Sequence, residues 1–217
     1  MRTQLAKISL AATAVAALAV FTGPAALAAG TWTVTGGTSL SGAPASGTTF
    51  TFTDTANSQS LACTGGAIAG TVTDESGSAN AAVSALTSLR FTSCTGPLGL
   101  SGSVAQATGT AATLNATSYN SGSKLTTGTI TSLNLNMTLS GALGTCAATI
   151  KGTAGITYSD TTLLLRFTTA GDSLKVTSTS GSCAGFVATG NPITLSSGTG
   201  GFILTGSPTN PIVIKQP

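Results

Sequence analysis

Residues 133–139 read Leu-Asn-Leu-Asn-Met-Thr-Leu, a strict alternation of apolar and polar side chains. In an extended chain this alternation places the apolar side chains on one face and the polar side chains on the other. Residues 31–35 and 49–53 repeat the pattern, with Trp and Val or two Phe residues set between threonines. Each stretch therefore predicts a half-buried antiparallel β-strand.

The same signal continues along most of the chain. Further strands are predicted at residues 67–73, 86–92, 111–119, 147–158, 161–168, 174–179, 202–205 and 212–214. Residues that favour turns, chiefly Gly, Asn, Asp and Pro, separate these stretches. Many short strands joined by such turns predict an all-β fold, either an antiparallel β-sandwich or a barrel-like sheet.

The first 29 residues have the pattern of a secretory signal peptide. Arg2 and Lys7 precede an apolar run at residues 8–21, and small residues follow up to Ala29. This arrangement predicts export, with cleavage near residue 28 or 29. An uncleaved anchor is the alternative, but the run of 14 residues is shorter than the roughly 20 that span a bilayer. We therefore expect a secreted protein, extracellular or held at the cell surface, with no transmembrane span in the mature chain.

The expected mature chain contains no His and only eleven charged residues. General acid–base catalysis, nucleophile activation and transition-metal binding draw on His, paired carboxylates or free Cys. Without Arg2 and Lys7 the net charge falls from +3 to +1, and the remaining cations are scattered singly. Nucleic-acid binding needs a basic patch or stripe. The composition thus argues against an enzyme, against a cofactor or metal site, and against a nucleic-acid partner.

Four cysteines, at positions 63, 94, 146 and 183, remain in the mature chain. In the oxidising compartment that export implies, they predict two disulfides. Zinc binding is the weaker alternative, because the chain has neither a Cys-x-x-Cys knuckle nor a His. Four cysteines allow three pairings.

The two halves of the chain share a pattern that suggests a duplicated unit. Two apolar residues and a cysteine recur 83 positions later: Phe50, Phe52 and Cys63 against Leu133, Leu135 and Cys146. Residues 88–93, Ser-Leu-Arg-Phe-Thr-Ser, precede Cys94 much as Ser-Leu-Lys-Val-Thr-Ser at 173–178 precedes Cys183. Low sequence complexity is the alternative explanation. Duplication predicts two sheet units of about 85 residues, at 30–125 and 126–217, as separate lobes or one fused domain. It favours the pairs Cys63–Cys94 and Cys146–Cys183.

Three short segments also carry a resemblance. They read Phe-Thr-Ser-Cys-Thr-Gly-Pro-Leu at 91–98, Leu-Asn-Ala-Thr-Ser-Tyr at 114–119 and Ile-Thr-Tyr at 156–158. With the signal peptide and the paired cysteines, they resemble the uncharacterised small secreted all-β proteins of actinobacteria. The resemblance covers most of the mature chain and implies secretion and fold alone, since no activity is associated with that group.

Two strings have the form of catalytic motifs but lack their context. Residues 181–185, Gly-Ser-Cys-Ala-Gly, resemble a nucleophile elbow, which needs a His base and a following helix. Residues 121–124, Ser-Gly-Ser-Lys, match Ser-x-x-Lys but lie in a Gly/Ser turn without a Lys-Thr-Gly partner. No catalytic residue is predicted.

The aromatic residues suggest one candidate binding site. Trp32 lies near the expected mature N-terminus, and two tyrosines end strands beside polar turn residues, Tyr119 beside Asn120 and Tyr158 close to Asp160. Aromatic faces stack on sugar rings while amides and carboxylates bind hydroxyls, so these five residues form the candidate ligand site. The alternative is structural: Trp32 caps an edge of the core, and the tyrosine hydroxyls hold loops.

These observations favour a non-enzymatic extracellular module that binds polysaccharide or envelope glycan. One alternative is a self-associating surface coat, because sheet edges with few charges do not deter pairing. Another is a carrier that holds an apolar ligand between sheets lined by small side chains.

Overall fold

The computed structural model describes residues 32–72, 75–78, 81–142, 144–183, 185–206 and 211–216, so the predicted signal peptide lies outside the described residues. The described chain is all-β, as the alternation predicts. Its strands are β1 (Trp32–Thr35), β2 (Ser39–Pro44), β3 (Phe50–Asp54), β4 (Gln59–Val72), β5 (Glu75–Ser78), β6 (Ala81–Thr95), β7 (Ser101–Gln106), β8 (Ala112–Asn120), β9 (Leu125–Gly141), β10 (Gly144–Ser159), β11 (Leu164–Thr168), β12 (Leu174–Gly181), β13 (Pro192–Ser196), β14 (Phe202–Gly206) and β15 (Val213–Lys215). A 3-10 turn, η1, spans Pro97–Gly99.

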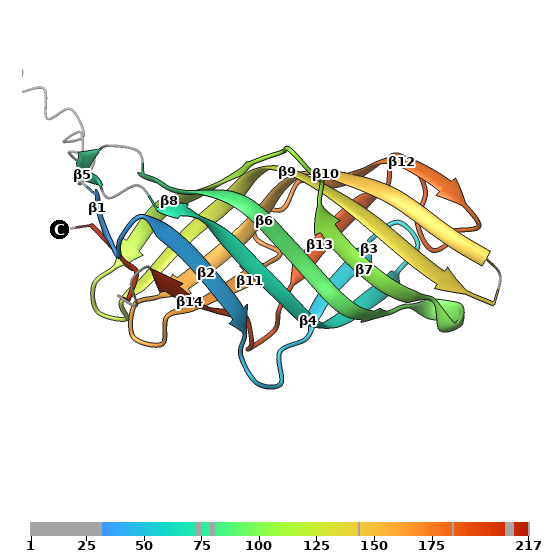
Figure 1. Cartoon of the computed structure of the whole chain (residues 1–217), viewed down its shortest axis with the longest axis horizontal. Helices are drawn as coiled ribbons and strands as arrows, with labels where there is room; N and C mark the ends of the chain where they lie inside the picture. The colour runs from blue at the N-terminus through green and yellow to red at the C-terminus, as the bar shows by residue number, and fades with distance from the viewer. Residues whose placement is uncertain are drawn as a thin grey trace, which may run out of the picture.

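The main sheet has twelve strands and closes on itself into a barrel-like wall (Figure 1). At the end that carries the disulfides, neighbouring strands follow the order β3, β4, β6, β7, β9, β10, β12, β13 and back to β3. At the other end the order is β2, β4, β6, β8, β9, β10, β11, β14 and back to β2. All these pairs are antiparallel and each ring follows the chain order. The sheet is therefore an up-and-down meander that closes at both ends.

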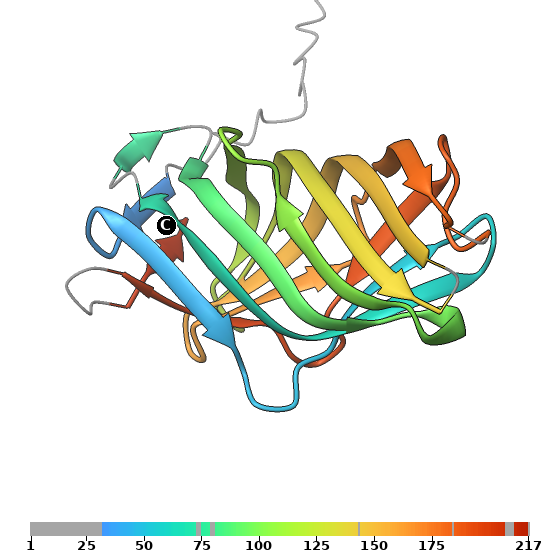
Figure 2. The same ribbon diagram turned by 45° about the vertical axis from the view of Figure 1, so that its right-hand side comes forward.

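Four long strands, β4, β6, β9 and β10, belong to both rings and change partner midway (Figure 2). In β9, Thr131 pairs with β8 and Leu135 with β7, and Ser132 between them has a φ of 59°. In β10 the change occurs at Gly152, whose φ is 138° and where a Cβ atom would collide with the carbonyl oxygen of Ser173. Such irregularities re-aim a strand, so that one strand can serve two different neighbours.

Large apolar side chains fill the space that the wall encloses. The ring centroid of Phe50 lies 5.0 Å from that of Phe91, 6.1 Å from that of Phe167 and 4.6 Å from that of Phe202. These four rings come from β3, β6, β11 and β14, and none is more than 1% exposed. Around these four rings the interior is therefore filled with side chains. On the outer face of the strands, threonine and serine occupy many of the alternate positions.

A separate three-stranded sheet, β15–β1–β5, lies at the end of the barrel opposite the disulfides, where Figure 1 also shows the C-terminus. We call this sheet the end cap. Its strands β1 and β15 pair antiparallel, with Val34 opposite Ile214. Three side chains of the barrel form hydrogen bonds with the backbone of Ile212 and Ile214. Tyr158 Oη donates to Ile212 O at 2.6 Å, Thr126 Oγ1 donates to Ile214 O at 3.0 Å, and Asp160 Oδ1 accepts from Ile214 N at 3.2 Å. The first and last described strands therefore pair with each other and cover this end of the core.

Tyr158→Phe is expected to lower the free energy of unfolding by about 1–2 kcal/mol, because it leaves the buried Ile212 carbonyl without its donor. Urea unfolding measures the change. Tyr119→Phe is the matched control, since its hydroxyl lies at the partly exposed rim, and it is expected to cost less than about 1 kcal/mol. Equal losses in the two variants would contradict this role of Tyr158.

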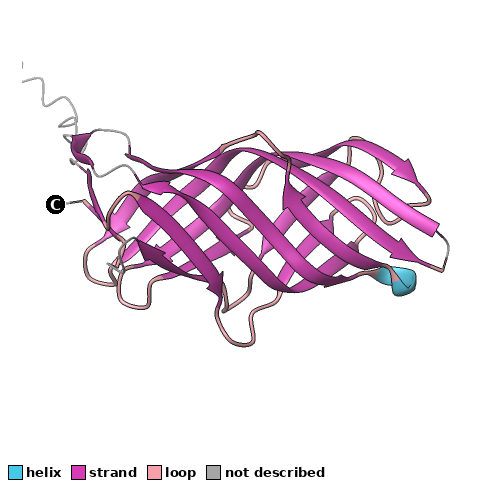
Figure 3. Ribbon diagram, viewed as in Figure 1, coloured by secondary structure: helices cyan, strands magenta, loops and turns pink. Residues whose placement is uncertain are grey.

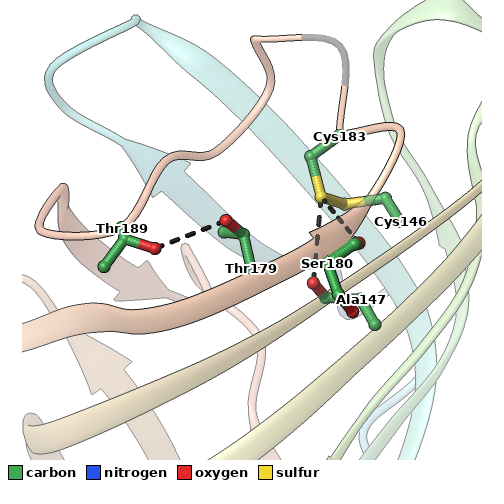
Figure 4. Close-up of a disulfide and its surroundings, with 6 residues drawn as sticks. All are labelled: Cys146, Ala147, Thr179, Ser180, Cys183 and Thr189. Atoms are coloured by element: carbon green, nitrogen blue, oxygen red, sulfur yellow. Dashed lines mark hydrogen bonds between the residues drawn. A yellow bond between two sulfur atoms is a disulfide. The ribbon is translucent and has the colours of Figure 1, made fainter.

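Both disulfides form the pairs that the predicted repeat favours. Cys63 bonds to Cys94, which lies directly opposite on β6, and Cys146 of β10 bonds to Cys183 in the loop after β12 (Figure 4). Figure 4 also shows Thr179 and Thr189, whose hydroxyl oxygens lie 3.3 Å apart and link β12 to that loop. The first bridge thus joins two neighbouring strands, and the second joins β10 to the loop that follows its neighbour β12.

The sequence-based strands agree with much of this sheet and miss some of it. The strands β2, β5, β7 and β13 have no counterpart among the predicted ranges. β2 reads Ser-Leu-Ser-Gly-Ala-Pro and β7 reads Ser-Gly-Ser-Val-Ala-Gln, so each contains a single large apolar residue and a weak alternation. The sheet runs without interruption across the proposed unit boundary at residue 125, because β9 pairs with both β7 and β8. Duplication itself remains a prediction.

Candidate binding site

Two of the five candidate residues lie inside the molecule. Trp32 is 3% exposed and Tyr158 is 0% exposed, and both belong to the core. Burial raises the pKa of Tyr158 far above its ordinary value, and the nearby Asp160 charge adds to this effect, so the hydroxyl stays protonated as a donor to Ile212 O. Neither ring offers a face to a ligand. Their positions match the structural alternative, in which the Trp ring covers an edge of the core and the Tyr hydroxyl holds a loop.

The other three candidates, Tyr119, Asn120 and Asp160, lie together at the capped end. Tyr119 follows a register shift between Ala116 and Ser118 in the pairing of β8 with β9. The shift reverses the alternation, so that Tyr119 lies opposite the buried Thr126 and packs against the core with one part of its ring. The rest of the ring stays exposed. Without the extra residue, the ring would point to the outer face of the wall.

Asp160 connects Tyr119 to the end cap. Its carboxylate accepts hydrogen bonds from the Tyr119 hydroxyl and from Ile214 N, and Lys124 and Lys215 lie close enough to act on its charge. Burial raises the pKa of Asp160, and the hydrogen bonds and the two lysines partly oppose this rise. Desolvation, the Asp160 charge and the hydrogen bond to it raise the pKa of Tyr119. The tyrosine is therefore a neutral donor at physiological pH.

Asn120 shapes the turn beside the tyrosine. Its side-chain Oδ1 accepts a hydrogen bond from Ser123 N at 3.0 Å, which closes the turn between β8 and β9. Lys124, the last residue of this turn, has a φ of 51°, and its carbonyl accepts from Asp160 N at 3.2 Å. The turn is thus joined both to Tyr119 and to Asp160 of the next hairpin.

Tyr119 lies between two open grooves. The first has a volume of about 620 Å³ and is lined by Tyr119 and by mainly polar neighbours: Ser118, Asn120, Ser121, Ser123, Leu125 and Thr127. The second has a volume of about 410 Å³ and is lined by Tyr119, Lys124, Asp160, Thr161, Val213 and Lys215. One aromatic ring therefore borders a neutral hydroxyl-rich groove and a groove that contains charges. We call this region the Tyr119 site.

Sequence reasoning missed Lys124 and Lys215 as members of this site. Each is a single cation next to a strand end, at residues 124 and 215, which is a weak signal by itself. Lys215 reaches the groove because β15 is attached to the barrel. One contact of this attachment, between Ile214 N and Asp160 Oδ1, joins residues that are 54 positions apart in the chain. The residues around Lys215 do not by themselves predict this long-range contact.

Two features are absent from the residues that the structure describes. No group of three or more His, Cys, Asp or Glu side chains within the described ranges is arranged to hold a metal ion. No helix in the described part of the chain is long and apolar enough to cross a membrane.

Comparison with protein-family models, with curated proteins and with solved structures finds no match to this chain.

Proposed function

We propose that the protein is a secreted, non-enzymatic module that binds polysaccharide or envelope glycan at the Tyr119 site. The observation that carries the proposal is the position of Tyr119, a partly exposed ring that borders both grooves. Sugar rings pack their C–H faces on aromatic rings, and their hydroxyls pair with amides, hydroxyls and carboxylates. The site supplies such partners in Asn120, Ser123 and Asp160.

Secretion is supported by the signal-peptide pattern at residues 1–29 and by the two disulfides, which persist in oxidising compartments. A non-enzymatic role is supported by the groove linings. Glycoside hydrolysis uses a pair of carboxylates, and Asp160 is the one carboxylate among the residues that line the two grooves. Its oxygen is also engaged by the end cap.

The fold gives less support to the other two functions. A surface coat built by strand pairing needs free sheet edges, and the strands of the main sheet form closed rings. The outward backbone groups of Ile214 in the end cap are bonded to Thr126 and Asp160. A carrier needs an open interior, and the four Phe rings occupy the space between the walls. Glycan binding is therefore the function that we propose.

Co-sedimentation of the oxidised mature protein with insoluble polysaccharides and with the producer's own cell walls tests the proposal. We expect saturable pelleting, reduced about tenfold or more in affinity by Tyr119→Ala, because the stacking ring is lost. Tyr119→Phe keeps the ring and is expected to retain most of the binding. Ile203→Ala is the control, since Ile203 is an exposed apolar residue on β14 (45% exposed). Pelleting no greater than with inert particles, or equal pelleting by wild type and Tyr119→Ala, would refute the proposal.

A further inference from the structure

Two lysines lie directly opposite each other on the outer face of the wall. Lys151 of β10 and Lys175 of β12 are register partners, and both are exposed. Side chains of directly opposed residues point to the same face, with Cβ atoms about 4.5–5.5 Å apart. The two ammonium groups can therefore approach a single point above the sheet.

No carboxylate of the described chain neutralises this pair. Neither lysine side chain makes a hydrogen bond or ion pair with another described residue. Asp172, the acidic residue nearest to Lys175 in the sequence, uses its two oxygens for other partners: Oδ1 accepts from Gly155 N at 2.7 Å and Oδ2 from Leu195 N at 2.8 Å. On its other side Lys151 lies opposite Asn134, which is uncharged.

Like charges in opposed positions disfavour strand pairing. Within the described sheet, no other two cations are register partners: Arg90 lies opposite Ala67 and Ala105, and Arg166 lies opposite Thr157. The lysine pair thus opposes the pairing of β10 with β12, and an anion bound between the two ammonium groups would remove this repulsion.

A polar groove begins next to the lysines. Asn136, Thr149 and Ser178 form the neighbouring row across β9, β10 and β12, about 7 Å along the strands. The groove has a volume of about 230 Å³ and is lined mainly by residues with polar or small side chains: Asn136, Thr138, Ala147, Ala148, Thr149, Ser178 and Ser180, together with Met137. Hydroxyl and amide groups there are complementary to a polymer rich in hydroxyls.

We propose that Lys151 and Lys175 bind one carboxylate or phosphate group of an anionic glycan, whose neighbouring hydroxyls lie over this groove. This anion site is on the outer wall and does not use Tyr119. It gives the protein a preference for acidic polymers, in addition to the glycan binding proposed for the Tyr119 site.

Titration of the mature protein with soluble polygalacturonate, with a glycerol phosphate polymer and with neutral dextran tests the proposal. We expect binding to at least one of the acidic polymers, weakened about tenfold by the double variant Lys151→Gln/Lys175→Gln, which is the effect of losing two exposed ion pairs. The acidic polymer that shows this loss identifies the anion as carboxylate or phosphate. The control Arg90→Gln/Arg166→Gln removes the same charge from isolated positions, and we expect it to weaken binding by less than about threefold.

Thermal unfolding shows that the variants are folded and provides a second measurement. Without polymer, Lys151→Gln/Lys175→Gln is expected to unfold at or above the wild-type temperature, because the repulsion is gone. Inorganic phosphate is expected to stabilise the wild type more than this variant. Equal loss of polymer binding in the lysine and arginine variants would overturn the proposal, as would binding by neither acidic polymer.

The two proposed sites are distinguishable in the same titrations. Tyr119→Ala is expected to leave the difference between the lysine variant and the arginine control unchanged. If Tyr119→Ala alone abolishes all binding to the acidic polymers, the lysine site is refuted and the Tyr119 site is supported.

Discussion

Replacing Cys63 and Cys94 by alanine is expected to lower the free energy of unfolding by roughly 3–4 kcal/mol. The bridge joins positions 31 residues apart and restricts the unfolded chain by that loop. Cys146 and Cys183 are 37 residues apart, so their replacement is expected to cost about the same. Many residues of this chain have small side chains that bury little area each, and the bridges are therefore a large part of the total stability. Urea unfolding of each double alanine variant measures the two costs.

The two bridges are expected to differ in how fast they are reduced. Cys63 and Cys94 are 0% and 1% exposed and lie within paired strands, whereas Cys183 is 8% exposed and lies in a loop beyond β12 (Figure 4). Thiolate attack needs access to a sulfur atom. Mild reduction followed by alkylation and mass analysis should therefore label Cys146 and Cys183 first. Simultaneous labelling of all four cysteines would show instead that reduction requires global unfolding.

The second large effect concerns Asp172, which lies where the chain passes from β11 to β12. Its two oxygens accept hydrogen bonds from Gly155 N and Leu195 N, so one side chain joins β10 to β13 across the gap between β11 and β12. Asp172→Ala leaves two buried N–H groups without acceptors. We expect this variant to lose roughly 3–6 kcal/mol in the free energy of unfolding. Ser173→Ala, at the exposed next position, is the control and is expected to change stability by less than about 0.5 kcal/mol.

Asp172 is also expected to make stability depend on pH. Burial raises the pKa of Asp172, and the two backbone hydrogen bonds oppose the rise only in part. The folded protein therefore binds this proton more tightly than the unfolded chain. The contribution of Asp172 is complete below the pKa of the unfolded chain, about 4, and decreases as the pH rises through the higher folded pKa. Unfolding measured from pH 4 upward should show this decrease in wild type and not in Asp172→Asn. An identical pH profile in both proteins would contradict the assignment.

The candidate site was predicted from sequence in part. The placement of Tyr119 and Asn120 at the end of a strand follows from alternation and turn chemistry, and the structure brings Tyr119 into hydrogen-bond contact with Asp160. The same reasoning treats Tyr158 as equivalent to Tyr119, because both end a strand beside a polar turn. They differ because the carbonyl of Ile212, directly before β15, accepts a hydrogen bond from the Tyr158 hydroxyl, while Tyr119 lines the groove beside Val213 and Lys215. The residues next to a tyrosine in the sequence do not show whether a distant segment buries it.

The amino-acid sequence by itself determined the all-β class and the approximate position of most strands, because both depend on local periodicity. It favoured the observed pairing of the cysteines over the other two pairings, but did not determine it. Composition also sets which side chains are present, and residues 30–217 contain no His and eleven charged residues. Tertiary structure alone decided that the sheet closes, that the end cap covers one end, and which aromatic side chains reach solvent. Closure depends on pairs such as Thr53 with Thr194 and Leu40 with Gly206, which are far apart in the chain. Alternation tells which face of a strand is apolar, but any apolar strand can pair with any other. One inserted residue, as between Ala116 and Ser118, exchanges the inward and outward faces of a strand. The partner of each strand and the exposure of each side chain are therefore decided only by the packing of the complete sheet.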